Sequence, residues 1–476
     1  MAIKRLKGKG AVMIYQNEDQ LKKGCESVIA REDGDVRVLD ESRFRETLID
    51  DLIYTAVFCP NPAIKEAAAF LIRRAAANLG IIPASIQSLY VAMGKSEVGG
   101  FTVPAINIRG ITYYAAQAAF RAANKKDVGP IIFEIARSEI GYTRQRPIEY
   151  ACAVLAAAIR TGWRGPVFLQ GDHFQINAKK FAADGEKETQ AVKDLIREAI
   201  EAGFYNIDID TSTLVDLSPP AIKDQQRSNF TLAAELTALI RDLEPEGITV
   251  SVGGEIGEVG KKNSTVEELQ TFMDGYLDEL KKRGQARKGI SKISVQTGTT
   301  HGGVPLADGS VARVKIDFET LQKLSQTARE KYGLSGAVQH GASTLPDEAF
   351  DRFPATGTAE IHLATGFQNI IYDSKSFPAP LRSKIYDHLE AELKGEWKEK
   401  DTKEQFIYKS RKKGFGPFKM ELWQMPAGVR DEICNELEGK FAFLFDKLNV
   451  KGTRPVLDQF IKPTDVPQKT PAALKG

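Results

Sequence analysis

Residues 165–175 read GPVFLQGDHFQ, and they combine the end of a buried strand with two chemically active side chains. The short apolar run at 166–169 is typical of a strand that is buried on both faces. After a Gln-Gly pair, Asp172 and His173 stand side by side where such a strand would reach the surface. Taken alone, this pair fits a surface turn better than a functional site. The stretches on both sides of it decide between the two interpretations.

Short runs of apolar and β-branched residues alternate with longer amphipathic stretches from about residue 100 to 370. Helical spacing of apolar residues, as in AVKDLIREAIEAG (191–203), predicts helices between these runs. Eight strands that alternate with helices over about 270 residues predict an α/β fold, a (β/α)8 TIM barrel. An open doubly wound sheet is the alternative, although no GxGxxG follows the first strand to indicate dinucleotide binding. The predicted strands are 103–108, 130–135, 167–170, 206–210, 249–253, 292–296, 337–339 and 359–363.

The segments that flank the predicted barrel have a different character. Residues 40–95 are predicted to be entirely helical, and residues 376–450 also carry helical patterns. The final segment is rich in Pro and Lys, which is typical of a flexible tail. We therefore expect an N-terminal helical extension at 1–95, the catalytic barrel at 96–375, a C-terminal helical extension at 376–460 and a tail at 461–476.

The composition limits the classes of partner. The 476 residues are enough for one large α/β domain with additions, or for two to three average domains. A net charge of +2 does not indicate a nucleic-acid or membrane partner. Four widely spaced cysteines without a CxxC predict neither a disulfide framework nor a cysteine zinc site. Because no apolar run approaches a signal peptide or the roughly 20 residues of a membrane helix, we expect a cytoplasmic protein.

Three of the five histidines follow the ends of different predicted strands. They are His173, His301 and His340, and Glu255 follows the end of a fourth strand. The carboxyl ends of barrel strands meet on one face, where the active sites of such barrels form. Imidazole nitrogens with a carboxylate are ligands that zinc prefers. The pattern predicts a site for Zn²⁺ or another divalent metal ion, although one such histidine alone would more often be structural.

Glycines follow two of these histidines. Gly302, and Gly341 with Ser343, would let backbone N–H groups approach an anion. The late loops of barrels are the usual place for a phosphate. The alternative is a tight turn between strand and helix, with Ser343 as the helix N-cap.

Nine stretches together carry a resemblance to a known family. They are VPAINIRG (103–110), PIIFEIARSEIGY (130–142), FLQGDHFQ (168–175), GFYNIDIDTSTL (203–214), GGEIG (253–257), QTGTTHGG (296–303), KIDFETLQKL (315–324), VQHGASTLPDE (338–348) and GTAEIHLATGFQ (357–368). In this order, over roughly residues 96–372, the chain resembles the class II, zinc-dependent fructose-bisphosphate aldolase family. The ordered set is specific for the superfamily and less specific for the substrate.

The resemblance implies a role for each residue of the opening pair. Asp172 would be the general acid/base that moves a hydroxyl proton, and His173 would be a zinc ligand. His301 and His340 match the other histidine ligands, and Glu255 matches a glutamate near or on the metal. Zinc would polarise the ketose carbonyl and stabilise the enediolate that cleavage leaves. For the substrate, the resemblance implies polar contacts from Asn107 and Ser212 and a phosphate cradle of Gly302, Gly341, Ser343 and Thr365.

The chain departs from the family pattern at three places. The family loop after the glutamate of strand five carries an acid that exchanges a proton with the enediolate carbon, and here Glu258 is the candidate. The family lysine just beyond the His301-Gly302 pair is missing. His362 stands where the family has an asparagine, so we expect it to contact the substrate, with a buried structural histidine as the alternative.

A basic segment, YKSRKKGFGPFK (408–419), lies in the C-terminal extension. In the resembled family, basic residues outside the barrel core, sometimes from a neighbouring subunit, contact the second phosphate of a bisphosphate. We therefore expect Arg411 or a neighbouring lysine to reach a substrate phosphate, and the C-terminal helices to mediate homo-oligomer formation. A solvated basic patch is the alternative.

The leading functional interpretation is a metal-dependent class II aldolase. It would reversibly cleave a ketose phosphate, similar to fructose or tagatose bisphosphate, to dihydroxyacetone phosphate and an aldehyde. The first alternative is a metal-dependent ketose 4-epimerase, which would cleave, rotate the aldehyde and rejoin it without protonating the enediolate. The second is a non-catalytic, aldolase-like subunit, which would have no need of an acid beside metal ligands.

Overall fold

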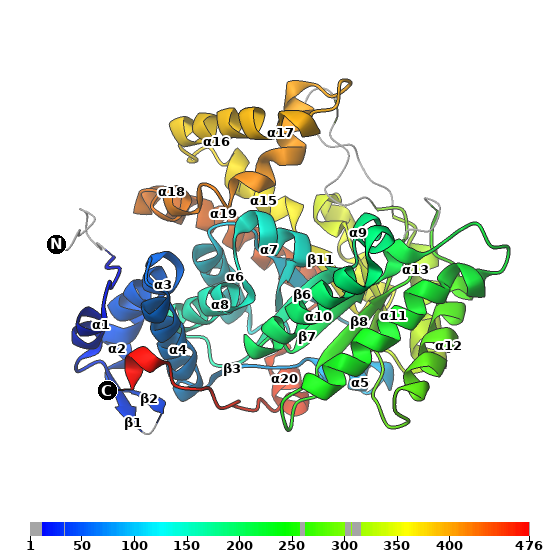
Figure 1. Ribbon diagram of the computed structural model, residues 1–476, viewed down its shortest axis with the longest axis horizontal. Coiled ribbons are helices and arrows are strands. Elements are labelled where there is room, and N and C mark those ends of the chain that lie inside the picture. The colour runs from blue at the N-terminus through cyan, green and yellow to red at the C-terminus, as the bar shows by residue number, and fades with distance from the viewer. Residues whose placement is uncertain (1–11, 33, 258–261, 300–305, 307–315, 476) are drawn as a thin grey trace.

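A computed structural model describes residues 12–475 except 33, 258–261, 300–305 and 307–315. Eight parallel strands close into a barrel, since each pairs with the next along the chain and β11 pairs with β4. The predicted (β/α)8 fold, with largely helical extensions at both ends, is confirmed (Figure 1). The barrel strands are β4 (Val103–Asn107), β5 (Ile132–Ala136), β6 (Gly165–Gln175), β7 (Asn206–Asp210), β8 (Ser251–Glu255), β9 (Lys292–Val295), β10 (Ala337–Gln339) and β11 (Glu360–Leu363).

The barrel strands are apolar runs because both of their faces are covered. Every residue of β4 and β5 is buried, with side chains directed alternately into the barrel and onto the surrounding helices. The larger helices of this layer include α8, which begins at Pro147 and ends before Gly162 in the left-handed conformation. The helices from the first to the last barrel strand are α6 (Thr112–Lys126), α7 (Arg137–Thr143), α8 (Pro147–Thr161), α9 (Ala178–Ala183), α10 (Gly185–Glu201), α11 (Ile222–Leu243), α12 (Val266–Lys282), α13 (Phe318–Tyr332) and α14 (Arg352–Ala355).

The N-terminal extension contains strands as well as helices. β1 (Ile29–Glu32) and β2 (Asp35–Val38) form an antiparallel hairpin. β3 (Ile81–Pro83) pairs in parallel with the first residues of β6, so the prediction that residues 40–95 are entirely helical is wrong at this short strand. Its three residues are too few to show a strand periodicity, and the pairing partner is remote in sequence. The helices are α1 (Glu18–Cys25), α2 (Glu41–Arg43), α3 (Ile49–Phe58), α4 (Pro62–Asn78) and α5 (Gln87–Gly94).

Most helices of the C-terminal extension form a layer in the upper part of Figure 1, whereas the last of them, α20 (Arg454–Phe460), lies near the bottom. The long helix α19 of the extension packs against α6, and the 3-10 turn η6 (Arg411–Gly414) packs against α7. Beyond the last helix, Asp465 accepts hydrogen bonds of 2.7 and 2.9 Å from Arg74 of α4. No helix in the described part of the chain is long and apolar enough to cross a membrane. The helix α15 (Thr365–Asp373) follows β11 and still belongs to the barrel, and the helices of the extension are α16 (Ala379–Glu392), α17 (Lys403–Ser410), α18 (Lys419–Trp423), α19 (Ala427–Lys447) and α20 (Arg454–Phe460).

Candidate active site

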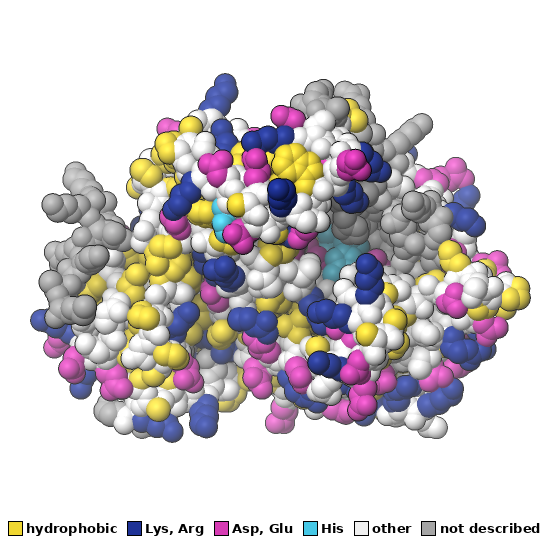
Figure 2. Space-filling model, turned by 45° about the horizontal axis from the view of Figure 1, so that its top comes forward, with side chains coloured by type: hydrophobic (Ala, Val, Ile, Leu, Met, Phe, Trp, Pro, Cys, Tyr) yellow, Lys and Arg dark blue, Asp and Glu magenta, His cyan; other side chains and the backbone are white. Residues whose placement is uncertain are grey.

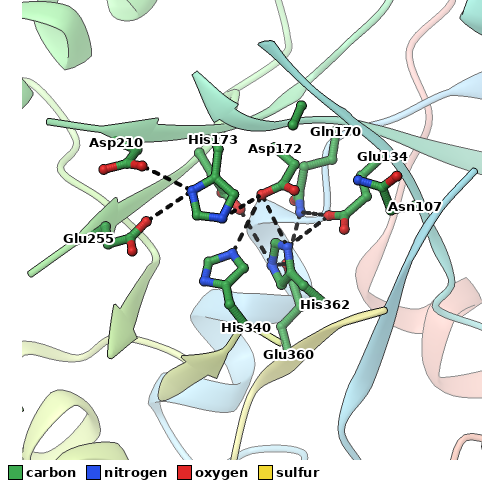
Figure 3. Close-up of polar contacts among 12 residues, drawn as sticks. Asn107, Glu134, Gln170, Asp172, His173, Asp210, Glu255, His340, Glu360 and His362 are labelled. Carbon is green, nitrogen blue, oxygen red and sulfur yellow. Dashed lines mark hydrogen bonds and ion pairs between the residues drawn. The ribbon is translucent and has the colours of Figure 1, made fainter. Parts of the chain in front are cut away.

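Polar side chains at or near the carboxyl ends of β6, β7, β8, β10 and β11 lie in one cluster (Figure 3). In the figure, Asp172 lies at the centre, with His173 on one side and His340 and His362 below it. Asp210 of β7 and Glu255 of β8 flank His173. The sequence-based expectation that these strand ends converge agrees with this geometry for the residues that the structure describes. The predicted residues Glu258, His301 and Gly302 lie outside the described residues.

A bulge in β6 directs Asp172 and His173 to different partners. The pairing of β6 with β7 is regular at Gly171, skips two residues and resumes at Phe174. His173 has a φ of 40°, a left-handed conformation that is uncommon for a residue with a side chain and is often found at functional sites. As a result, the His173 ring faces Asp210 and Glu255, whereas the Asp172 carboxylate faces His340 and His362. Because of this distortion, the side chains of Asp172 and His173 diverge more than those of neighbouring residues in a regular strand.

His173, Glu255 and His340 form a set of potential metal ligands. One donor atom from each lies within 4.8 Å of the other two. His173 Nδ1 lies 3.2 Å from Glu255 Oε2, and the rings of His173 and His340 are 4.2 Å apart at their centroids. Burial, together with the neighbouring His362 and His173, holds the pKa of His340 well below its usual range, which favours the neutral imidazole that binds metals. Two imidazoles and a carboxylate with room for a further ligand fit Zn²⁺ or a similar divalent ion.

The Asp172 carboxylate is buried beside these ligands. Its Oδ1 lies 3.5 Å from His340 Nε2 and 3.3 Å from His362 Nδ1. Burial alone would raise the pKa of Asp172, but the imidazoles of His173 and His362 more than offset this effect and lower the pKa well below its usual range. Asp172 is therefore ionised and can accept a proton.

A buried network of charged side chains lies beneath Asp172, inside the barrel. His362 Nε2 is 2.7 Å from Glu360 Oε1, and His362 Nδ1 is 3.0 Å from Glu134 Oε2. The Lys292 ammonium pairs with Glu360 at 2.5 Å and with Asp208 at 3.0 Å. Burial, followed by the charge of Asp172, raises the pKa of Glu134 to about 8. The charged members of this network other than His362 are not predicted from the sequence, although charges inside otherwise apolar strands are a signal that could have identified them.

A pocket of about 500 Å³ opens above the cluster. It is lined by Asp172, His173, His340 and His362 and by the predicted substrate-contact residues Asn107, Gly341, Ser343 and Thr365. Figure 2 shows histidine side chains in this hollow, with cationic side chains close to it. The structure thus brings two candidate ligands, His173 and His340, the candidate acid/base Asp172 and most predicted substrate contacts to one cavity.

Two predicted substrate contacts lie elsewhere. The Ser212 hydroxyl donates a 2.7 Å hydrogen bond to Asp210, behind His173, and Ser212 does not line the pocket. The guanidinium of Arg411 is buried and donates to Asp373 at 2.5 and 3.0 Å and to Asn369 at 2.6 Å. The neighbouring Lys412 lines the pocket instead.

Comparisons with known proteins identify one enzyme family. The sequence profile of the family described as fructose-bisphosphate aldolase class-II matches residues 88–413. No curated protein sequence matches the chain. Among solved structures, a probable tagatose 6 phosphate kinase from Sinorhizobium meliloti is 18% identical, with coverage of 78% of this chain and 96% of that chain and a TM-score of 0.51. A fructose-bisphosphate aldolase from Campylobacter jejuni is 19% identical, with coverage of 78% and 96% and a TM-score of 0.45. At these identities, the structural likeness concerns the fold alone.

Proposed function

The chain belongs to the class II fructose-bisphosphate aldolase family, and we propose that it is a metal-dependent aldolase that reversibly cleaves a ketose phosphate. The products would be dihydroxyacetone phosphate and an aldehyde. The observation that carries the proposal is the position of the ionised Asp172 carboxylate, which adjoins the His173–Glu255–His340 donor set at a pocket that Asp172, His173 and His340 line. A scaffold protein would gain nothing from burying these charges together, because burial of ionisable groups is costly.

In this proposal, the donor set provides the metal ligands. His173, Glu255 and His340 would hold a zinc-like ion, with His301 as a further ligand. Such an ion would act as a Lewis acid on the carbonyl of the ketose. Asp210 would keep the ring of His173 in place through its contact with Nδ1.

Asp172 moves the proton in the proposed reaction. In cleavage, its carboxylate accepts the proton from the hydroxyl on the carbon that becomes the aldehyde, and in synthesis it returns this proton. Asn107 Oδ1 is buried and accepts no hydrogen bond from the described residues, so it is available to a substrate hydroxyl. Gly341, Ser343 and Thr365 also line the pocket and would contact a phosphate, and Gly341 has the left-handed φ of 68°.

A ketose 4-epimerase is the second candidate, because of two features of the sequence. The loop that follows Glu255 offers only Glu258 as an acid before Glu267, and no lysine directly follows the His301-Gly302 pair. An enzyme that rejoins its two fragments in the site has no need to protonate the enediolate carbon. It would therefore tolerate a loop that lacks a suitable acid.

Incubation of the zinc-loaded protein with phosphorylated and free ketoses separates the candidates. Triose release that stops on chelation supports the aldolase, and accumulation of the C4 epimer without triose supports the epimerase. A fully metallated, folded protein that does neither would contradict both and leave the aldolase-like subunit.

A further inference from the structure

A second cavity, of about 940 Å³, lies between the N-terminal extension and the barrel. Its walls come from α3 and α4 of that extension, from α8 and α10 around the barrel and from residues between 466 and 471 of the C-terminal tail. In Figure 1, the tail is the red segment that runs from α20 back to the N-terminal extension. None of the described residues that line this cavity lines the candidate active site. Its volume is within the range of ligand-binding pockets.

Apolar side chains form much of the cavity wall. Phe70 and Ile200 are buried. Ile148, Leu243 and Val466 are partly buried and pack against the hydrophobic core. Transfer of apolar groups from water to such a wall is favourable, and ligand pockets are typically apolar with a few polar groups that orient the ligand. The wall therefore favours a ligand with an apolar body.

Arg73 of α4 supplies a cation to this wall. Its Nη2 donates a 2.9 Å hydrogen bond to the carbonyl oxygen of Glu201, whereas its Nε is buried and has no hydrogen-bond partner among the described residues. No carboxylate in the described part of the chain forms an ion pair with Arg73. The adjacent Arg74 differs, because it pairs with Asp35 at 2.9 Å and with Asp465 at 2.7 Å.

The surroundings of Arg73 make an unpaired charge costly. Tyr205 and Cys152 also line the cavity, and burial raises the pKa of each to about 12, so both are neutral at neutral pH. Burial also lowers the pKa of Arg73 itself. A second arginine in the wall, Arg146, has a carboxylate partner, since its Nε donates a 2.9 Å hydrogen bond to Glu198. An anion that enters the cavity would therefore be stabilised most at Arg73.

We propose that this cavity binds a small amphiphilic carboxylate, with its carboxylate on Arg73 and its apolar body against the wall formed by α4, α8 and the tail. A carboxylate accepts charge-assisted hydrogen bonds from a guanidinium, and these are stronger than hydrogen bonds between neutral groups. The inference goes beyond the proposed function and does not rest on it. Because three parts of the chain line the cavity, the ligand would also stabilise the packing of the N-terminal extension and the tail on the barrel.

Calorimetric titration of the full-length, metal-loaded protein with decanoate, below its micelle concentration, tests this site. Decanol is the matched neutral probe. We expect decanoate to bind and Arg73→Met to weaken its binding by about 10- to 100-fold, as for loss of a charged hydrogen bond, with the affinity for decanol changed by less than about twofold. Lys22→Met, at an exposed residue of α1, is the control and should change neither affinity. No binding of decanoate, or equal losses for decanoate and decanol, would overturn the inference.

A second measurement locates the ligand in the unmodified protein and does not depend on the folding of a variant. A decanoate analogue with a terminal diazirine is crosslinked by light, and the labelled peptides are identified by mass spectrometry. We expect the label in α4 and in the tail, and excess decanoate should suppress it. Label confined to the walls of the candidate active site would contradict the inference. Dissociation of an oligomer by Arg73→Met, measured by sedimentation, would make the cavity a contact between copies of the chain and would also reject it.

Discussion

Oδ2 of Asp210 lies 3.0 Å from Nδ1 of His173, so a carboxylate of β7 orients the imidazole at the end of β6. Asp210 is itself held in place, since Ser212 and Gln175 donate hydrogen bonds to it at 2.7 and 2.5 Å. Burial would raise the pKa of Asp210, but the hydrogen bond and charge of His173, together with the hydrogen bonds from Ser212 and Gln175, lower it. Ser212 was predicted to contact the substrate. Instead, it donates a hydrogen bond to Asp210, the residue that orients His173.

Asp210→Asn should weaken metal binding by about 10- to 100-fold, the usual effect of removing the partner of a ligating histidine. Competition with a chromophoric chelator measures the affinity directly. Asp216→Asn, at an exposed residue bonded to Ser218, serves as the control. An unaltered affinity in Asp210→Asn would show that His173 does not depend on this carboxylate.

His340→Ala should lose the bound metal and, with it, turnover. Because this buried imidazole is neutral, its ring nitrogen is available to a metal, whereas alanine offers no donor atom. Elemental analysis of purified protein gives the metal content per chain. His388→Ala, which removes a histidine that packs on Phe418 of the C-terminal layer, should keep its metal. Full metallation of His340→Ala would reject the proposed donor set.

Asp172→Asn should retain the metal while turnover falls by about 10²- to 10⁴-fold, because an amide cannot accept the hydroxyl proton. Metal content and kcat are measured on the same preparation. If turnover were unchanged with metal bound, another group would have to carry the proton.

Glu134→Gln should change how stability depends on pH. The pKa of Glu134 is about 8 in the folded protein and near 4.5 in the unfolded chain, so between these values the folded state holds a proton that the unfolded state releases. The stability of the unmodified protein relative to Glu134→Gln should therefore decrease as pH rises from 5 to 7.5, by up to about 1.4 kcal/mol per pH unit.

Urea unfolding of the unmodified protein and Glu134→Gln at several pH values tests this relation. Glu319→Gln, at an exposed side chain that pairs with Lys323, should follow the unmodified protein at every pH. A constant difference between the unmodified protein and Glu134→Gln would indicate that Glu134 is already ionised at pH 5.

The sequence was sufficient to predict the site residues that directly follow barrel strands. Asp172, His173, Glu255 and His340 each follow an apolar run, and closure of a parallel barrel necessarily brings such positions together. The left-handed backbone of His173 could not be predicted, because it arises from the mismatch between β6 and β7. The sequence also could not show whether Arg411 or Lys412 faces the pocket. Adjacent residues of a 3-10 turn point in different directions, and only the packing of η6 on α7 determines which one faces the pocket.

The seam of the barrel joins segments that are far apart in the chain. Thr102 Oγ1 donates a 2.7 Å hydrogen bond to the carbonyl oxygen of Thr358, across a separation of 256 residues, and α19 then covers α6. At about 5–20 residues per second, a ribosome would hold β4 with an unpaired edge for a time on the order of tens of seconds. The apolar face of α6 stays uncovered for longer, until α19 emerges. The last long helix to be synthesised thus completes the cover of the first barrel helix, and nascent chains halted before it carry an exposed surface that invites aggregation or chaperone binding.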